Sequence, residues 1–190
     1  MNTLLSDFLQ KPAFVVAPQL LGCILEREIN GQIIRVRIVE TEAYDQSDAA
    51  SHSYKGPTLR TEIMFGEAGH LYVYFTYGMH YCCNIVTGKK GTGAAVLIRA
   101  VEPLDGLEYM HDLRPVSGVQ VSNGPAKLCQ ALAIDKALNG HDLTELPLKL
   151  VIQKPLAARL ITQTTRVGIS QAQDSLWRFY ITGNEYVSKL

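Results

Sequence analysis

The sequence has no excess of charge of either sign and no long apolar run. Its 18 basic and 18 acidic residues give a formal net charge of zero, which excludes a general attraction to nucleic acid and leaves only local phosphate contacts. No run approaches the roughly 18 to 20 apolar residues that span a bilayer, so no membrane association is predicted. The opening residues MNTLLSDFLQK also lack the basic start and the apolar segment of a secretion signal. A cytoplasmic protein is therefore predicted, associated with the nucleoid in a bacterium, or a nuclear one in a eukaryote.

Cysteine pairs and metal-ligand patterns are missing as well. The four cysteines are Cys23, Cys82, Cys83 and Cys129. They lie among apolar neighbours and form no C-x-x-C pair, which predicts reduced core thiols and suits a reducing compartment. The separations of His52, His70 and His80 match no compact ligand motif, so neither a metal nor any other cofactor is predicted.

Apolar residues, in contrast, are abundant. Hydrophobic residues make up 47% of the 190 positions, which is enough for a substantial core. No internal repeat, low-complexity tract or linker divides the chain. Residues 1–190 are therefore predicted to form a single domain.

The stretch GHLYVYFTYGMHYCCNIV at 69–86 gathers more aromatic and sulfur-bearing side chains than any other part of the sequence. Side chains alternate between the two faces of a strand, which separates Tyr72 and Tyr74 from the mainly apolar residues between them. Gly78 tolerates positive φ and predicts a tight turn that returns the chain as a second strand. Tyr77 then lies at the hairpin tip without core neighbours, which favours contact with a partner. The alternative is that both strands are ordinary buried sheet.

A second hairpin is predicted earlier in the chain. Asn30-Gly31 separates residues 23–29 from residues 32–44 and is the strongest short signal for a two-residue turn. Strand alternation in the second segment places one row of side chains on one face: Ile34, Val36, Ile38, Glu40, Glu42 and Tyr44. A core-facing row is thus predicted to end in two carboxylates.

The remaining regular elements have weaker signals. Residues 12–21 favour a short helix. Residues 123–139 predict a longer helix, with Asn123 as its N-cap and apolar residues near helical spacing. Two short strands are predicted at 148–152 and 177–181.

Two connecting segments have the composition of functional loops. Residues 45–61 are rich in Asp, Ser, Thr and Gly and form a loop of unusual length for a compact domain. The TGKKGTG loop at 87–93 places Lys89 and Lys90 between glycines, which suits either phosphate binding or an ordinary solvated loop. In the strand that follows, Arg99 interrupts an apolar run and needs an anion as partner.

Glu42 and two of the cysteines are the candidate catalytic residues that the sequence offers. A carboxylate at the end of an apolar row is partly desolvated, which suits a general base. The alternative is an ordinary glutamate that is paired with Arg99. Cys82 or Cys83 beside His80 could form a thiol nucleophile, but adjacent cysteines in an apolar strand are more typical of buried, inert thiols.

Segments with the motifs of one known family follow one another along most of the chain. They are IVETEAY at 38–44, DAASHS at 48–53, MFG with GHLYVYFTYGMHYCCNIV at 64–86, VLIRAVEPLDGLE at 96–108, NGPAKLCQALAI at 123–134, and RVGIS with WRFYITGN in the tail. They closely resemble the 3-methyladenine DNA glycosylase family of the alkyladenine (N-methylpurine) type. Several of the motifs are too long for chance agreement.

The resemblance implies a fold and an activity. The fold is α+β, a single compact domain around antiparallel strands with a protruding hairpin and surrounding helices. The activity is that of a monofunctional glycosylase, which flips an alkylated purine out of double-stranded DNA and hydrolyses its N-glycosidic bond without a metal or covalent lyase chemistry. The implied partner is double-stranded DNA containing alkylated purines, and the implied oligomeric state is a monomer.

Five residues of the implied site surround the base and the water. By resemblance Glu42 is the base that activates water, and Arg99 lies near it or near the lesion nucleotide. Tyr44, His52 and Tyr74 match the positions that enclose the flipped base by stacking and contact.

Two further residues match positions with other roles. Asn84 matches the residue that screens against the 2-amino group of normal guanine, and Tyr77 matches the wedge that fills the gap in the duplex. The sequence departs from the family in the lengths of the loops before His52 and before Arg99. It also has Thr61 where many relatives have asparagine.

Two other classes of protein stay open on the residues alone. A non-catalytic module for damaged or single-stranded nucleic acid would keep the tyrosines but would have no need of Glu42. A thiol-dependent hydrolase would need an exposed cysteine beside His80.

Overall fold

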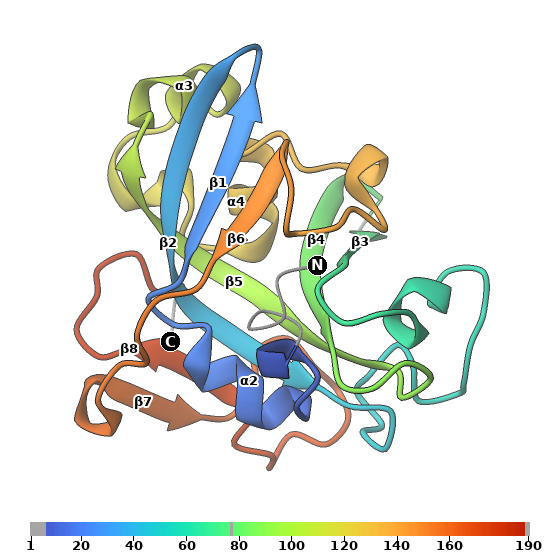
Figure 1. The fold of residues 1–190 in the computed structure, drawn as a ribbon. Coiled ribbons are helices and arrows are strands. Elements are labelled where there is room, and N and C mark those ends of the chain that lie inside the picture. Colours follow the sequence, from blue (N-terminus) through green and yellow to red (C-terminus); the bar gives the residue numbers. More distant parts are fainter. Residues whose placement is uncertain (1–6, 77, 189–190) are drawn as a thin grey trace.

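The computed structural model describes residues 7–76 and 78–188. Its strands are β1 (Ile24–Ile29), β2 (Gln32–Tyr44), β3 (Leu71–Thr76), β4 (His80–Thr87), β5 (Ala94–Asp105), β6 (Leu148–Val151), β7 (Ile161–Thr164) and β8 (Arg178–Ile181). Its α-helices are α2 (Ala13–Gln19), α3 (Leu107–Leu113) and α4 (Pro125–Ala131), and its 3-10 helices are η1 (Glu62–Phe65), η2 (Gly118–Val121), η3 (Lys136–Leu138) and η4 (Ala158–Leu160). Helices around a curled antiparallel sheet confirm the predicted α+β class (Figure 1).

β2 is the strand around which the sheet is built. The sheet order is β3-β4-β5-β2-β1-β6, and β8 pairs with both β2 and β7. Residues 40–42 of β2 have β5 on one side and β8 on the other. Because strands flank this end of β2, its side chains lie inside the protein, and Glu40 and Glu42 are both fully buried.

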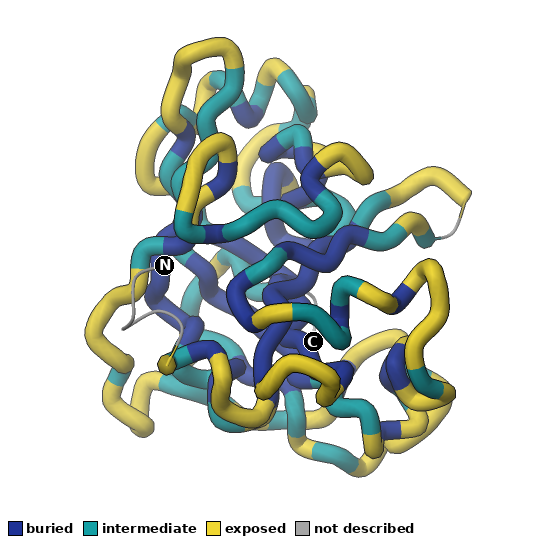
Figure 2. Tube along the Cα trace, turned by 45° about the vertical axis from the view of Figure 1, so that its right-hand side comes forward, coloured by how far each residue is buried: buried dark blue, intermediate teal, exposed yellow. Residues whose placement is uncertain are grey.

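Most of the apolar core lies between the sheet and the α-helices. α4 packs on β4 and β5, and α2 packs on β2 and β5. Ala13, Val16 and Ala17 form the buried stripe of α2 at helical spacing, which confirms the predicted short helix. Figure 2 shows the buried interior in dark blue and the exposed loops in yellow.

Both predicted hairpins are present. Asn30 and Gly31 have φ of 51° and 79°, as a two-residue turn with positive φ at both positions requires. β3 and β4 form the second hairpin, in which Tyr72 is opposite Asn84. Gly78 has φ of 69°. Tyr77 lies outside the described residues, so its predicted place at the tip stays a prediction.

The predicted row of six side chains on one face of β2 is wrong. Between the pairs Ile38↔Val101 and Glu40↔Ala100, β2 carries one extra residue, Val39. This β-bulge shifts the alternation, so Ala43 joins the same core cluster as Ile38, while the Thr41 hydroxyl donates to the Ala17 carbonyl of α2 at 2.9 Å. The carboxylates after the bulge therefore do not continue the apolar row.

A second bulge lies directly opposite. From Glu40↔Ala100 to Thr41↔Ile98, β5 carries the extra residue, and that residue is Arg99. Bulges next to functional sites often redirect a side chain. Here the bulge places the arginine beside both carboxylates of β2.

The helix predicted at 123–139 is shorter than expected, and its predicted N-cap is wrong. Gly124 occupies the N-cap position without a side-chain cap, while Asn123 Oδ1 accepts a hydrogen bond from Lys127 Nζ at 2.7 Å. The helix ends at Ala131, and Ala133 has a φ of 45°. Helical hydrogen bonding cannot continue through a left-handed residue, so η3 starts again with Asp135 as its cap.

Two elements had no clear signal in the sequence. α3 begins after Gly106, which has a φ of 78° and supplies no capping side chain. β7 has the short and mostly polar sequence ITQT. The predicted strands at 148–152 and 177–181 are confirmed as β6 and β8.

The described residues include four free cysteines, all buried, as the sequence predicts. Within residues 7–76 and 78–188, no helix has both the length and the apolar character needed to cross a membrane.

Candidate active site

A cavity of about 460 Å³ opens beside the β3–β4 hairpin. β3 and β4 contribute Tyr72, Tyr74, Cys82 and Asn84, β2 and β5 contribute Tyr44 and Arg99, and the loops contribute His52 and the segment 167–171. We call this the tyrosine cavity. Its volume falls within the range of about 300 to 1,000 Å³ that is usual for small-molecule sites.

Strand alternation accounts for the wall formed by the hairpin. Leu71 and Val73 belong to the main core, whereas Tyr72 and Tyr74 belong to a separate group on the cavity side. The Tyr72 and Tyr74 rings are nearly parallel, with centroids 5.7 Å apart. The predicted separation of the two faces is therefore confirmed.

His52 completes the aromatic wall from the long loop at 45–61. Its ring meets Tyr74 edge-on with the centroids 4.6 Å apart, and its Nδ1 lies 3.1 Å from the Tyr72 hydroxyl. Desolvation by these rings, and then the positive charge of Arg60, lower the pKa of His52. The imidazole is therefore kept neutral, which suits a contact with a cationic ligand.

The hydroxyl of Thr61 organises the far end of the same loop. It accepts a hydrogen bond from the Thr58 amide at 2.9 Å and lies 3.4 Å from the Gly56 carbonyl. Thr61, at the position where many relatives have asparagine, therefore has a structural role within the loop. Close by, the guanidinium of Arg60 lies 5.8 Å from the centroid of Tyr74 at the cavity mouth.

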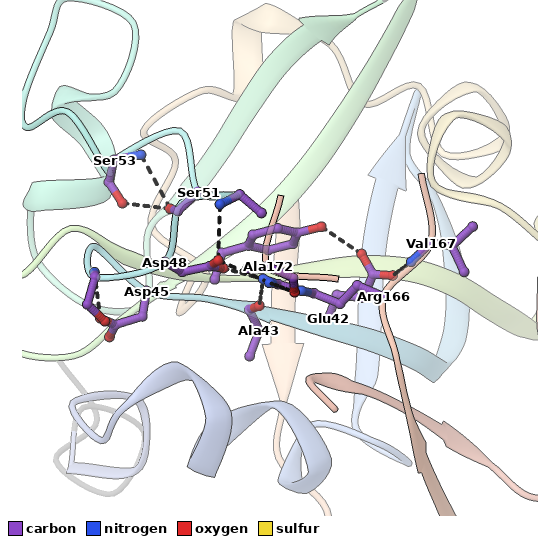
Figure 3. A network of polar contacts seen from close by, with 12 residues as sticks. Glu42, Ala43, Asp45, Asp48, Ser51, Ser53, Arg166, Val167 and Ala172 are labelled. Carbon is purple, nitrogen blue, oxygen red and sulfur yellow. Dashed lines mark hydrogen bonds and ion pairs between the residues drawn. The ribbon is translucent and has the colours of Figure 1, made fainter. Parts of the chain in front are cut away.

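Glu42 is held beneath the cavity by three donors among the described residues. Its Oε1 accepts from the Val167 amide at 2.8 Å, and its Oε2 accepts from the Tyr44 hydroxyl at 2.8 Å and pairs with Arg99 Nη1 at 3.2 Å. Burial, and then the negative charge of Glu42, raise the pKa of Tyr44, which keeps this hydroxyl protonated as a donor. Figure 3 shows the bond from the Val167 amide to this carboxylate.

Arg99 has the anionic partners that the sequence predicts. Its Nε lies 3.3 Å from Glu40 Oε1, and its Nη1 lies 3.2 Å from Glu42 Oε2. Burial lowers the pKa of Arg99, but the two carboxylates outweigh burial and raise the pKa above its usual value. Arg99 therefore stays charged next to the cavity.

A buried ion pair below Tyr44 was not predicted. Arg166 binds Asp48 through both terminal nitrogens, and it donates to the Ala43 carbonyl at 3.0 Å. Both residues lie in the quoted motifs RVGIS and DAASHS, but neither was given a role. Opposite charges separated by more than 100 positions give no local pattern, so pairing could not be read from the spacing.

Two residues of the basic loop at 87–93, Gly93 and Lys90, have structural contacts that account for them. A Cβ atom at Gly93 would lie 2.6 Å from the Phe65 ring, so this glycine permits close packing. Lys90 pairs with Glu67 at 3.1 Å, with both side chains largely exposed. Phosphate binding by this loop stays one of the two alternatives that the sequence offers.

A larger cavity of about 720 Å³ lies elsewhere, between β1, β2 and the segment 153–160. None of the predicted site residues lines it. Its arginines are already paired with carboxylates, Arg35 with Glu26 and Arg37 with Glu102. The chemically equipped site is therefore the smaller tyrosine cavity.

Comparison with known proteins places this chain in a family. The family profile described as methylpurine-DNA glycosylase matches residues 7–185. The chain belongs to the methylpurine-DNA glycosylase family. Curated relatives provisionally named 3-methyladenine DNA glycosylase include those of Carboxydothermus hydrogenoformans (51% identity, 96% of this chain and 97% of the relative) and Methanoculleus marisnigri (45%, 98% and 99%). The relative from Chlorobaculum tepidum is 43% identical over 100% of this chain and 92% of its own length.

The methylpurine-DNA glycosylase motifs account for most of the tyrosine cavity. The structure brings together six of the seven residues assigned from the sequence: Glu42, Arg99, Tyr44, His52, Tyr74 and Asn84. Asn84 donates through Nδ2 to the Tyr72 carbonyl at 3.1 Å, which fixes its amide at the cavity wall. Tyr77 lies outside the described residues.

The described residues offer little support for the thiol alternative. Burial is the largest of the effects that raise the pKa of Cys82 to about 11, which opposes formation of a thiolate. His80 lies at the exposed start of β4, opposite Thr76. Across residues 7–76 and 78–188, no group of three or more His, Cys, Asp or Glu side chains is arranged to hold a metal ion.

Proposed function

We propose that this protein is a monofunctional DNA glycosylase that removes alkylated purines from double-stranded DNA by hydrolysis. The observation that carries the proposal is the Glu42–Arg99 pair beneath a cavity walled by Tyr44, Tyr72 and Tyr74. The family membership and the names of the relatives support the same chemistry.

The aromatic walls suit an extruded base. A base inside a duplex is out of reach, and extruding it costs a few kcal/mol in lost stacking and pairing. Stacking on an aromatic side chain returns about 1 to 3 kcal/mol per base. Methylation at N3 or N7 makes a purine cationic, and cation–π attraction to tyrosine adds about 0.5 to 2 kcal/mol. The cavity therefore favours an alkylated purine over a neutral one.

Glu42 suits activation of a water molecule. A carboxylate has about four acceptor positions, and three donors of the described residues occupy Glu42. One position is left to accept a proton from water. The same negative charge stabilises the oxocarbenium-like sugar that forms as the base leaves, while the ion pair with Arg99 holds the carboxylate in its orientation.

Incubation with methylated duplex DNA and chromatography of the released bases tests the proposal. Free methylated purines and intact strands with abasic sites are expected, with no strand cleavage. A chelator such as EDTA is expected to leave the rate unchanged. Tight binding of methylated DNA without any base release would instead identify a non-catalytic binding module, and rescue by added zinc after chelation would show that a metal takes part.

A further inference from the structure

Arg166 is the buried residue at which three parts of the cavity wall meet. Its side chain lies in the interior and binds Asp48 of the long loop, the Ala43 carbonyl of β2 at 3.0 Å, and the Ala172 carbonyl of the tail at 3.4 Å (Figure 3). Asp48 in turn accepts from the Ala50 amide at 3.0 Å. One guanidinium thus joins β2, the loop that carries His52 and the tail segment.

The guanidinium also lies against two aromatic rings. Its central carbon is 4.7 Å from the centroid of Tyr44 and 5.3 Å from that of Trp177. Trp177 stacks on Phe14 of α2 with the centroids 6.0 Å apart, and its carbonyl accepts from the Ala43 amide at 2.8 Å. The support behind Tyr44 therefore extends to helix α2.

Hydrogen bonding alone does not account for the orientation of Arg166. Its Nε is buried and has no hydrogen-bond partner among the described residues, a condition that is unusual and costs stability. A planar cation stacked on Tyr44 and Trp177 is held by the rings as well as by its bonds. The side chain therefore leaves Nε without a hydrogen bond while its guanidinium stays against the Tyr44 and Trp177 rings.

The residue that follows Arg166 touches the proposed base. Val167 donates its amide to Glu42 Oε1 at 2.8 Å. Any rotation of the Arg166 backbone would move that amide. Arg166 is thus linked to Tyr44 through its side chain and to Glu42 through its neighbour.

We propose that Arg166 is a positioning residue, which fixes the ring plane of Tyr44 against the extruded purine and holds the Val167 amide on Glu42. This inference rests on the proposed function and adds a residue to it. Asp48 is the counter-ion that neutralises Arg166, so the guanidinium can support Tyr44 without repelling a cationic purine.

Arg166→Lys is the first test, because lysine keeps the charge but lacks the planar fork and stacks poorly. Base release from a methylated duplex at saturating protein is expected to slow by about 10- to 100-fold per folded molecule, the effect of a small misplacement. Affinity for a duplex with a stable abasic-site analogue, which presents no base to Tyr44, is expected to stay within about threefold. Arg159→Lys, at an exposed arginine of η4, is the matched control and is expected to behave as the parent.

A neutral pair separates positioning from stability. Breaking a buried ion pair on one side leaves an unpaired charge, whereas Asp48→Asn combined with Arg166→Gln leaves none and keeps an acceptor for the Ala50 amide. This double variant is expected to melt within about 5 °C of the parent and still to release bases at least about tenfold more slowly. Release at the parental rate per folded molecule would overturn the inference, since stability alone would then explain Arg166.

Fluorescence of Trp177 gives a readout that does not depend on activity. It is the one tryptophan of the chain, so its emission reports on the contact with Arg166. A shifted emission maximum is expected in both Arg166 variants and not in Arg159→Lys, and unchanged emission would contradict the stack. If the parent protein releases no base, the proposed function fails while the emission test stands. If the variants shift the emission but release bases at the parental rate, this inference alone fails.

Discussion

Glu40 and Glu42 lie two positions apart on β2 and are equally buried, but they differ in their hydrogen-bond partners. Glu40 accepts from Arg178 Nε at 2.6 Å, from the Ser188 amide at 2.7 Å and from the Ser188 hydroxyl at 2.9 Å, and it also contacts Arg99. Of these partners, Arg99 lines the tyrosine cavity, whereas Arg178 and Ser188 do not. Glu42 is bound by Tyr44, Arg99 and Val167, all of which line that cavity.

The comparison shows that burial and charge pairing do not by themselves identify a catalytic carboxylate. Both glutamates pair with Arg99, so the same cation contacts the structural carboxylate of Glu40 and the proposed catalytic carboxylate of Glu42. The difference lies in the remaining donors. Four donors from Arg99, Arg178 and Ser188 bind Glu40, whereas three donors among the described residues bind Glu42, which leaves one of its about four acceptor positions for water.

Replacing Glu42 by Gln is expected to have the largest effect on activity. Loss of a general base should lower base release by about 10² to 10⁴, while binding of methylated duplex stays close to that of the parent. Single-turnover release and lesion affinity are the two measurements. Release at the parental rate would end the role of Glu42 as the base.

Replacing Glu40 by Gln is expected to reverse that pattern. Arg178 would lose its buried counter-charge, which costs about 3 to 5 kcal/mol of stability, or roughly 6 to 20 °C in melting temperature for a chain of this size. Release per folded molecule should fall by less than about tenfold, because Arg99 keeps Glu42 as a partner. A stable variant with a large loss of release would mean that the two carboxylates act together.

Tyr77→Ser separates DNA distortion from the chemistry at Glu42. Inserting a ring into the gap left by an extruded base restores about 1 to 3 kcal/mol of stacking. Removing it should weaken duplex binding and slow base release by roughly 10- to 100-fold. At the predicted exposed tip, the change should hardly move the melting temperature, since exposed substitutions change stability by less than about 0.5 kcal/mol. A destabilised variant with normal release per folded molecule would contradict the wedge.

Asn84→Ser tests the part of the cavity wall that β4 forms. One group that rejects an exocyclic amino group is worth about 1 to 3 kcal/mol of discrimination, so the shorter side chain should increase the release of normal guanine about 5- to 150-fold. The amount of guanine released, relative to a methylated purine in the same reaction, is the measurement. An unchanged ratio would place the selectivity elsewhere.

The sequence predicts the hairpin side of the site well because its signals are local. Alternation in β3 separates Tyr72 and Tyr74 from the main core, and outside the site the Asn30-Gly31 signal predicts the β1–β2 turn in the same local way. Such patterns depend on a few neighbouring residues. They require no knowledge of which distant segments meet.

The Glu40–Glu42 comparison shows what the sequence could not supply. A period-two pattern places Glu40 and Glu42 alike, and it does not reveal the bulges at Val39 and Arg99 that bring the strand ends into register. The partners that distinguish the two carboxylates, Ser188 and Val167, come from the distant tail. Long-range pairing of this kind leaves no periodicity, so the strand pattern offered Glu42 only as one candidate base, and the resemblance to a family gave it its role.

The smallest expected effect concerns pH and His52 at the cavity mouth. Desolvation and then Arg60 lower its folded pKa below the value of about 6.5 in the unfolded chain. Between these two pKa values the unfolded chain therefore binds more protons than the folded protein. The stability that His52 contributes is fully present above about pH 6.5 and is lost as the pH falls toward the folded pKa. Below the folded pKa it no longer changes. His52→Gln should remove this part of the pH dependence. Melting temperatures at about pH 7.5 and about pH 5.5 should differ more for the parent than for the variant, and equal differences would show that Tyr72, Tyr74 and Arg60 do not hold the imidazole neutral.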